Sequence, residues 1–206
     1  MNPPKKVKFV EEQGRRFGPC RRRPDPGSSS DAMSPDAGIY VHVPFCRQRC
    51  HFCSFAITTH RDFEDGWFDG VLEETALRAP AWTGRDFDSV YFGGGTPSLV
   101  AADRLAAILA RLRETFRIAD DSEITVEVNP GDLSPADLDV LRAAGVNRLS
   151  VGVQSFDDGD LEFLTRHHSG AEGRDAIRFA RAAGFECLTI DLLYGIPGRR
   201  VDGWKR

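Results

Sequence analysis

The sequence predicts an α/β fold in which a parallel sheet with crossover helices closes into a barrel or partial barrel. Between residues 38 and 206, runs rich in β-branched and aromatic residues alternate with runs that repeat apolar residues at the helical period. The strand-like runs are uniformly apolar, which is typical of a parallel sheet covered by helices. An open doubly wound sheet would normally carry a glycine fingerprint after its first strand, and cysteines stand there instead. Polar residues and glycines follow the strands, as they do at the active face of barrels.

The expected elements alternate in order along the chain. Five strands are predicted at residues 39–43, 87–92, 124–128, 148–153 and 187–193. Helical periods cover residues 63–77, closed by Pro80, and then 101–116, 157–164 and 171–183. A further helix starts with Ser134 as N-cap and Pro135 as its first residue, and stops at Gly145.

The first 37 residues differ in composition from the rest. They hold eight Lys and Arg against five Asp and Glu, a charge of +3, whereas residues 38–206 carry nineteen against twenty-six, or −7. Because residues 1–37 are rich in Pro, Gly and Ser and lack an apolar period, we expect a disordered basic tail. The basic clusters could contact nucleic acid or anionic lipid, but a solvated tail or a mis-assigned start is the simpler interpretation. No nucleic-acid partner is expected, and Cys20 is expected to have no role.

Length and composition indicate a globular protein. A chain of 206 residues with 41% hydrophobic residues can bury a core and suggests one to two domains. No run of about 18 apolar residues exists, so no membrane span is expected. The N-terminus lacks the apolar stretch of a signal peptide, and a cytoplasmic location is expected. Reduced thiols in that compartment favour a metal or cluster over disulfides.

Three of the five cysteines follow the first predicted strand with the spacing C-x3-C-x2-C: Cys46, Cys50 and Cys53. Three thiolates within eight residues can surround one soft metal ion or an iron–sulfur cluster. A zinc site would need a fourth ligand, which His51, or Cys20 or Cys187 from afar, could supply. If these three cysteines alone hold a four-iron cluster, one iron is left open for chemistry.

Further candidate residues lie at the carboxyl ends of the later strands. The turn Gly93–Pro97 lets the backbone lie along a ligand, unless it serves only as a tight turn. Glu127 alternates with apolar neighbours and should point into the barrel mouth, where burial without a polar partner would be costly. Gln154 and Asp191 follow the same logic, with a salt bridge as the alternative for Asp191. For Arg166–His168, a surface loop or a core hydrogen bond is simpler than a metal site.

The cysteine spacing resembles that of the radical S-adenosylmethionine (SAM) superfamily. The positions of Tyr40, six residues before Cys46, and of Phe52, just before Cys53, add to this resemblance. In that superfamily the open iron chelates the amino and carboxylate groups of SAM, and an injected electron cleaves SAM to a 5′-deoxyadenosyl radical. The resemblance implies a 4Fe-4S cluster, SAM as cofactor, and an electron donor such as a flavodoxin or ferredoxin. It also implies a partial TIM-type (β/α) barrel of the radical SAM type.

Five motifs in order are similar to the oxygen-independent coproporphyrinogen III oxidase family, which includes the haem chaperones called HemW. They are Tyr40–Cys46, Val90–Leu99, Glu123–Pro130, Ala144–Phe156 and Ile190–Gly198. By this resemblance Cys46, Cys50 and Cys53 ligate the cluster, and Gly94, Gly95 and Thr96 line the methionine part of SAM. The residues that would complete the SAM pocket are Tyr40, Phe52, Glu127, Gln154, Arg166 and Asp191.

Two departures from the family pattern affect the expected function. The oxidase branch has another cysteine two residues beyond the third, where this chain has Phe55, so the sequence resembles the HemW branch. That branch implies binding of haem and its transfer to an acceptor protein. The family also has further strands and a C-terminal domain, so residues 38–206 are expected to be an incomplete core, truncated after about five βα units. Alternatives are a coproporphyrinogen III oxidase and a non-catalytic zinc-binding or interaction domain.

Overall fold

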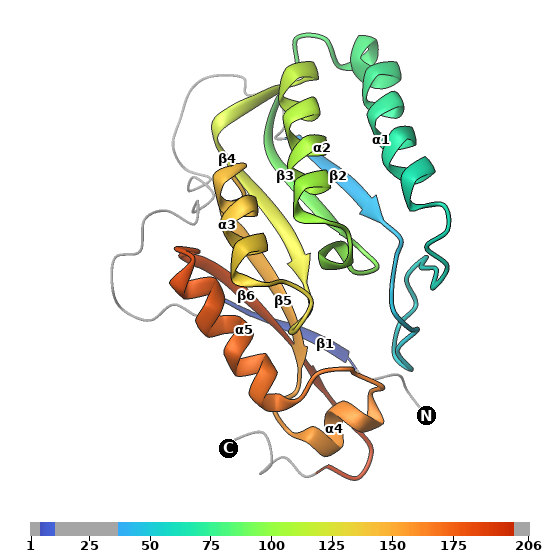
Figure 1. Ribbon diagram of the computed structural model, residues 1–206, viewed down its shortest axis with the longest axis vertical. Helices are drawn as coiled ribbons and strands as arrows, with labels where there is room; N and C mark the ends of the chain where they lie inside the picture. The colour runs from blue at the N-terminus through green and yellow to red at the C-terminus, as the bar shows by residue number, and fades with distance from the viewer. Residues whose placement is uncertain (1–4, 11–36, 200–206) are drawn as a thin grey trace, which may run out of the picture.

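The computed structural model describes residues 5–10 and 37–199, which form a single six-stranded sheet with helices along it (Figure 1). The strand order is β1-β6-β5-β4-β3-β2, and β2 to β6 all run parallel. Their bounds are Gly38–Val43 for β2, Asp86–Gly94 for β3, Arg117–Val128 for β4, Arg148–Gln154 for β5 and Cys187–Tyr194 for β6. The five predicted parallel strands are therefore confirmed, and with them the partial (β/α) barrel.

The helices connect consecutive strands and lie along the sheet in chain order (Figure 1). Their bounds are Glu64–Arg78 for α1, Ala102–Thr115 for α2, Pro135–Ala143 for α3, Asp158–Phe163 for α4 and Gly170–Ala182 for α5. Ser134 caps α3 as predicted, because its side chain accepts the Asp137 N–H while the Asp137 carboxylate accepts the Ser134 N–H. Among the described residues, no helix combines the length and apolar composition needed to cross a lipid bilayer.

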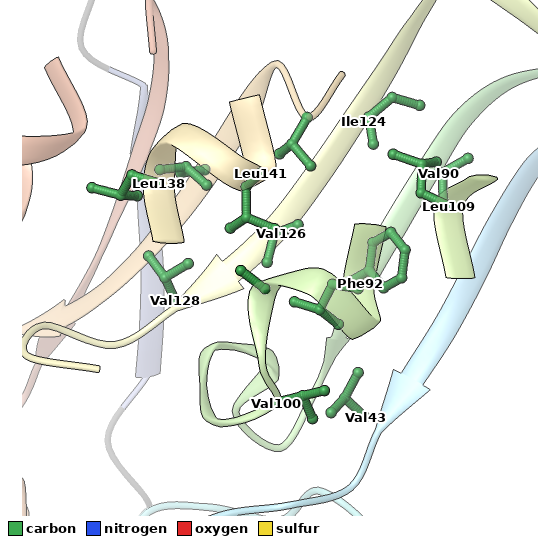
Figure 2. Packing of buried hydrophobic residues seen from close by; sticks show 14 of the residues in the cluster. Val43, Val90, Phe92, Val100, Leu109, Ile124, Val126, Val128, Leu138 and Leu141 are labelled. Carbon is green, nitrogen blue, oxygen red and sulfur yellow. The ribbon is translucent and has the colours of Figure 1, made fainter. Parts of the chain in front are cut away.

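The main core lies between the sheet and these helices (Figure 2). Figure 2 shows Phe92 of β3 and Val126 of β4 facing Leu109 of α2 and Leu141 of α3, and all four side chains are fully buried. Side chains alternate between the two faces of a strand, so a strand that gives one set of residues to this core presents the other set to the opposite face. Val126 and Val128 of β4 belong to the core, which leaves Glu127 on the opposite face, as predicted.

The structure differs from the sequence prediction at two strands. Residues Lys5–Val10, inside the segment expected to be disordered, form β1 and pair antiparallel with β6. The edge of β6 offers backbone partners that a purely local prediction does not include. The rest of that segment, with Cys20, lies outside the described residues. Strand β4 begins at Arg117 rather than near Ile124, because Arg117 and Ile118 pair with Asp86 and Phe87 of β3 ahead of a register shift between the two strands.

Candidate functional site

A cavity of about 310 Å³ lies where the parallel strands end. Its walls include every predicted site residue except Tyr40. They are Cys46, Cys50, Phe52, Cys53, Gly94, Gly95, Thr96, Glu127, Gln154, Arg166 and Asp191. The carboxyl ends of parallel strands meet at one edge, so residues separated by up to 145 positions in the sequence, from Cys46 to Asp191, reach one space.

The cysteine loop, Cys46–Cys53, leaves β2 and runs along one side of this cavity. Cys46 is buried, and burial raises the pKa of its thiol although a contact with Thr96 Oγ1, 3.4 Å from Sγ, opposes that effect. The Cys50 sulfur lies 3.6 Å from Arg166 Nη1, which donates to it. Cys53 N–H donates to the Cys50 carbonyl, which turns the loop back on itself. In the described part of the chain, no group of three or more His, Cys, Asp and Glu is placed to hold a single metal ion.

The glycine turn after β3 fits closely against the end of β2. Gly94 has a φ of +116°, and a Cβ there would lie 2.4 Å from the ring Nδ1 of His42. A Cβ on Gly95 would lie 2.6 Å from the Phe45 carbonyl oxygen, because the Gly95 N–H donates to the Val43 carbonyl at 2.7 Å. These glycines therefore have a packing reason to lack side chains, in addition to any role beside a ligand.

Glu127 has two donors from the protein. Tyr91 donates its hydroxyl to one carboxylate oxygen at 2.7 Å, and the Gly94 N–H donates to the other at 3.3 Å. Burial and, next, the bond to Glu127 raise the pKa of Tyr91, so its hydroxyl stays protonated. These two hydrogen bonds from β3 thus offset the predicted cost of burying the Glu127 carboxylate. Through the Gly94 bond, Glu127 fixes the glycine turn at the cavity wall.

Gln154 and Arg166 bring unpaired polar atoms to the same wall. Within the described residues, neither Gln154 Oε1 nor Arg166 Nε, both buried, has a hydrogen-bond partner. Gln154 also has a φ of +69°, a region that non-glycine residues rarely occupy. Arg166 Nη2 donates to Asn129 Oδ1 at 2.5 Å and to the Gly152 carbonyl at 2.7 Å, which fixes the guanidinium in place. Both residues line the cavity, and each has one buried polar atom without a partner, which is typical of a polar ligand site.

The comparisons with known proteins agree with this geometry. A model described as the radical SAM superfamily matches residues 40–205. The chain belongs to the radical SAM superfamily. It is 36% identical over 191 residues to a mouse protein named radical S-adenosyl methionine domain-containing protein 1, mitochondrial. That alignment includes 90% of this chain and 43% of the mouse protein. It is 38% identical over 173 residues to the heme chaperone HemW of Mycobacterium tuberculosis. That alignment includes 82% of this chain and 44% of HemW.

A solved structure shows the same fold. The structure of coproporphyrinogen III oxidase (HemN) from Escherichia coli, a radical SAM enzyme, is similar with a TM-score of 0.76 and 34% sequence identity. The match covers 84% of this chain and 41% of that protein. This chain therefore spans less than half the length of each relative described. Radical SAM proteins use an iron–sulfur cluster and SAM. The names of the HemW and oxidase relatives refer to haem and to a porphyrinogen.

The residues of this radical SAM chain fit both groups. Three cysteines from one loop line the cavity, as an iron–sulfur cluster requires. The unpaired Gln154 acceptor and Arg166 donor match the ammonium and carboxylate of an amino acid, which SAM carries. Phe52 and Asp191 line the same cavity.

Tyr40 is the predicted site residue that the structure places outside the cavity. Its side chain is 56% exposed and stacks on Tyr91, with 6.1 Å between ring centroids. Its hydroxyl lies 3.3 Å from His42 Nδ1, beside the glycine turn. Tyr40 and His42 lie on one face of β2, and neither lines the cavity, whose lining begins at Cys46 beyond the strand end. Sequence reasoning also missed Asp132, which no motif marks, and Ser150, which lies within the Ala144–Phe156 motif but was not singled out; both line the cavity.

His168 supports the cavity wall and makes stability depend on pH. Its Nε2–H donates to the Val153 carbonyl at 3.0 Å, which agrees with the predicted core hydrogen bond. Burial and, next, the charge of Arg166 lower the pKa of His168 from 6.5 to about 4. Because the folded protein resists protonating this ring, its contribution to stability is complete above pH 6.5 and is lost as the pH falls towards 4.

We expect the free energy of unfolding of the parent protein to decrease when the pH is lowered from 7 to 5. The decrease should be smaller in His168→Gln. Urea denaturation of both proteins at the two pH values measures this difference. His60→Gln is the matched control, since His60 is exposed. If the free energy of unfolding depends on pH equally in His168→Gln and in the parent protein, His168 is not the source of the pH dependence.

Proposed function

We propose that this chain is the cluster- and SAM-binding core of a haem-handling radical SAM protein of the HemW type. The observation that carries the proposal is the meeting of three thiols with two unpaired buried polar atoms in one cavity. The named relatives support the haem part, since HemW of Mycobacterium tuberculosis is a heme chaperone at 38% identity. Haem or a porphyrin, a haem-acceptor protein, and a flavodoxin or ferredoxin as electron donor are the partners this proposal requires.

The side chains have separate roles in this proposal. Cys46, Cys50 and Cys53 hold a 4Fe-4S cluster, while Gly94, Gly95 and Thr96 lie along the methionine part of SAM. When bound, the reduced cluster supplies the electron that cleaves SAM to a 5′-deoxyadenosyl radical. The pocket is completed by Phe52, Glu127, Gln154, Arg166 and Asp191, with Tyr40 acting from outside the cavity through His42.

The protein's own groups bind and orient the amino-acid part of SAM. Gln154 would hold the ammonium group through Oε1 and Arg166 would hold the carboxylate through Nε–H, which would give both buried atoms the partner they lack. Asn129 and the Gly152 carbonyl hold the Arg166 guanidinium in position before any ligand arrives. A side chain on Gly152 would crowd Asn129 Oδ1, at 2.9 Å from its Cβ, so the absence of one preserves this arrangement.

Phe55 separates the HemW proposal from the oxidase alternative. It lies two residues beyond Cys53, where the oxidase pattern has a thiol, and its half-exposed ring lines the cavity. A phenyl ring can neither donate a proton nor carry charge. The proposal is therefore that cluster and SAM binding are retained while oxidative decarboxylation of coproporphyrinogen III is not.

An anaerobic assay with reductant, SAM and either haem or coproporphyrinogen III tests this function. We expect this chain, and any longer form that contains it, to bind haem, seen as a change in haem absorbance, and to release no carbon dioxide from coproporphyrinogen III. The reconstituted protein without reductant is the control for background release. Stoichiometric carbon dioxide above that background assigns the protein to the oxidase alternative, and a colourless, zinc-containing protein assigns it to the zinc alternative.

A further inference from the structure

An ion pair joins the cysteine loop to the loop that follows β4. Arg47, the residue directly after Cys46, points Nε and Nη2 at the same carboxylate oxygen of Asp132, each at 3.1 Å. The Arg47 side chain is 56% exposed, whereas that of Asp132 is only 7% exposed. The second Asp132 oxygen accepts the Ser98 hydroxyl at 3.0 Å. The carboxylate is thus fixed from inside the protein and offers one oxygen to an arginine at the surface.

The hydrogen bonds continue from Ser98 back to the first cysteine. Ser98 Oγ accepts the Asn129 backbone N–H at 3.0 Å, and Asn129 Nδ2 donates to Thr96 Oγ1 at 3.2 Å. Thr96 Oγ1 lies 3.4 Å from Cys46 Sγ. Because Arg47 adjoins Cys46 in the chain, these contacts close a loop, which we call the Cys46 ring: Cys46, Arg47, Asp132, Ser98, Asn129 and Thr96.

Within this ring the Arg47–Asp132 contact is the one with a solvent-exposed partner. Cys46, Thr96 and Ser98 are all buried. An ion pair with an exposed arginine is weak and is screened by salt, whereas the buried hydrogen bonds are costly to leave unmade. The pair can therefore open while the sheet and the rest of the ring stay intact.

We propose that the Arg47–Asp132 pair is a latch that holds the cysteine loop over Cys46 and so controls access to that thiol. When the latch is closed, Cys46 is 9% exposed and in contact with Thr96. When it is open, the loop separates from Asp132 and the thiol can be reached from solvent. Arg47 and Asp132 are positioning residues in this proposal. That the latch also controls cluster insertion and loss rests on the proposed function. That the latch shields the Cys46 thiol does not depend on it.

The test compares alkylation of Cys46 and Cys50 in the same cluster-free protein of residues 1–206, kept reduced and anaerobic. Iodoacetamide is neutral, and mass spectrometry of the peptides gives the rate at each cysteine. We expect Arg47→Gln to raise the ratio of the Cys46 rate to the Cys50 rate several-fold. Removing a positive charge beside a thiol lowers its reactivity by electrostatics alone, so an increase reports access. Arg47→Lys keeps the charge pair and should restore most of the protection.

The matched control is Arg117→Gln, which removes an ion pair to Asp86 of 2.9 Å in which both side chains are exposed. It should leave the ratio unchanged. Salt gives a test without any substitution, since 0.5 M NaCl should raise the ratio in the parent protein and not in Arg47→Gln. An unchanged ratio in Arg47→Gln together with no salt effect overturns the latch.

Loss of iron to a chelator separates this inference from the proposed function. If the chain takes up a cluster, we expect Arg47→Gln to lose iron several-fold faster than Arg117→Gln. If the chain takes up no cluster, the proposed function fails, and the alkylation ratio still decides whether the latch exists. Equal iron loss from both variants, with an unchanged alkylation ratio, overturns the latch while leaving the proposed function standing.

Discussion

We expect the replacement of Cys50 with alanine to abolish iron incorporation and the replacement of Cys187 to leave it intact. Cys50 lies in the cysteine loop at the cavity, next to Arg166, while Cys187 begins β6 at the end of the strand away from Asp191 and the cavity. A cluster held by three thiolates cannot form stably on two, so Cys46→Ala and Cys53→Ala should have the same effect as Cys50→Ala. Iron and sulfide per chain after anaerobic reconstitution measure the outcome.

The same experiment distinguishes a cluster from zinc. In the zinc alternative a fourth ligand is needed: if it is His51, His51→Ala would lose metal along with the cysteine variants, and if it is Cys20 or Cys187, the alanine variant of that cysteine would. In the cluster proposal His51→Ala keeps its iron and its brown colour. Loss of iron in Cys187→Ala as complete as in Cys50→Ala contradicts a site of three cysteines with one open iron.

Gly95→Ala destabilises the protein by about 1–3 kcal/mol and disrupts the proposed SAM cradle. The new Cβ would lie 2.6 Å from the Phe45 carbonyl oxygen and 2.7 Å from Pro44 C, and backbone atoms cannot rotate away as a side chain can. The turn must separate from β2, which breaks the bond from the Gly95 N–H to the Val43 carbonyl. Urea denaturation measures the free energy of unfolding, and binding of radiolabelled SAM measures the cradle.

Gly70→Ala is the matched control for that substitution. Gly70 lies in the interior of α1, and an added Cβ there would meet nothing within 4 Å. Alanine favours a helix over glycine by up to about 1 kcal/mol, so this variant should be slightly more stable. Equal stability of Gly95→Ala and the parent protein would show that the turn is not packed against β2 as described.

Much of the fold follows from local patterns in the sequence. The helix starting at Ser134 was predicted from a capping residue followed by proline, and both act within one turn of the helix. Glu127 was placed on the cavity face because strand side chains alternate, and Val126 and Val128 are buried on the other face. The shared site was predicted because the strands are parallel, which brings their carboxyl ends together.

The remaining features depend on partners that are distant in the sequence. Strand β1 exists through pairing with β6, more than 170 residues later, and the early start of β4 depends on the pairing of Arg117 and Ile118 with β3 across a register shift. Asp132 has no motif of its own and becomes a site residue only through Arg47 and Ser98. The sequence leaves the glycine turn as either a ligand cradle or a tight turn, and its contacts with His42 and Phe45 appear only once β2 and β3 are paired.

Electron paramagnetic resonance of the reduced, reconstituted protein, with and without SAM, tests the central claim most directly. The claim is that three cysteines leave one iron open beside Gln154, Arg166 and the glycine turn, so that SAM reaches the cluster within this cavity. The account predicts that SAM changes the g-values and line shape of the cluster signal, and that Glu127→Ala weakens this response because Gly94 loses its carboxylate acceptor. A cluster spectrum that stays unchanged at saturating SAM contradicts the account.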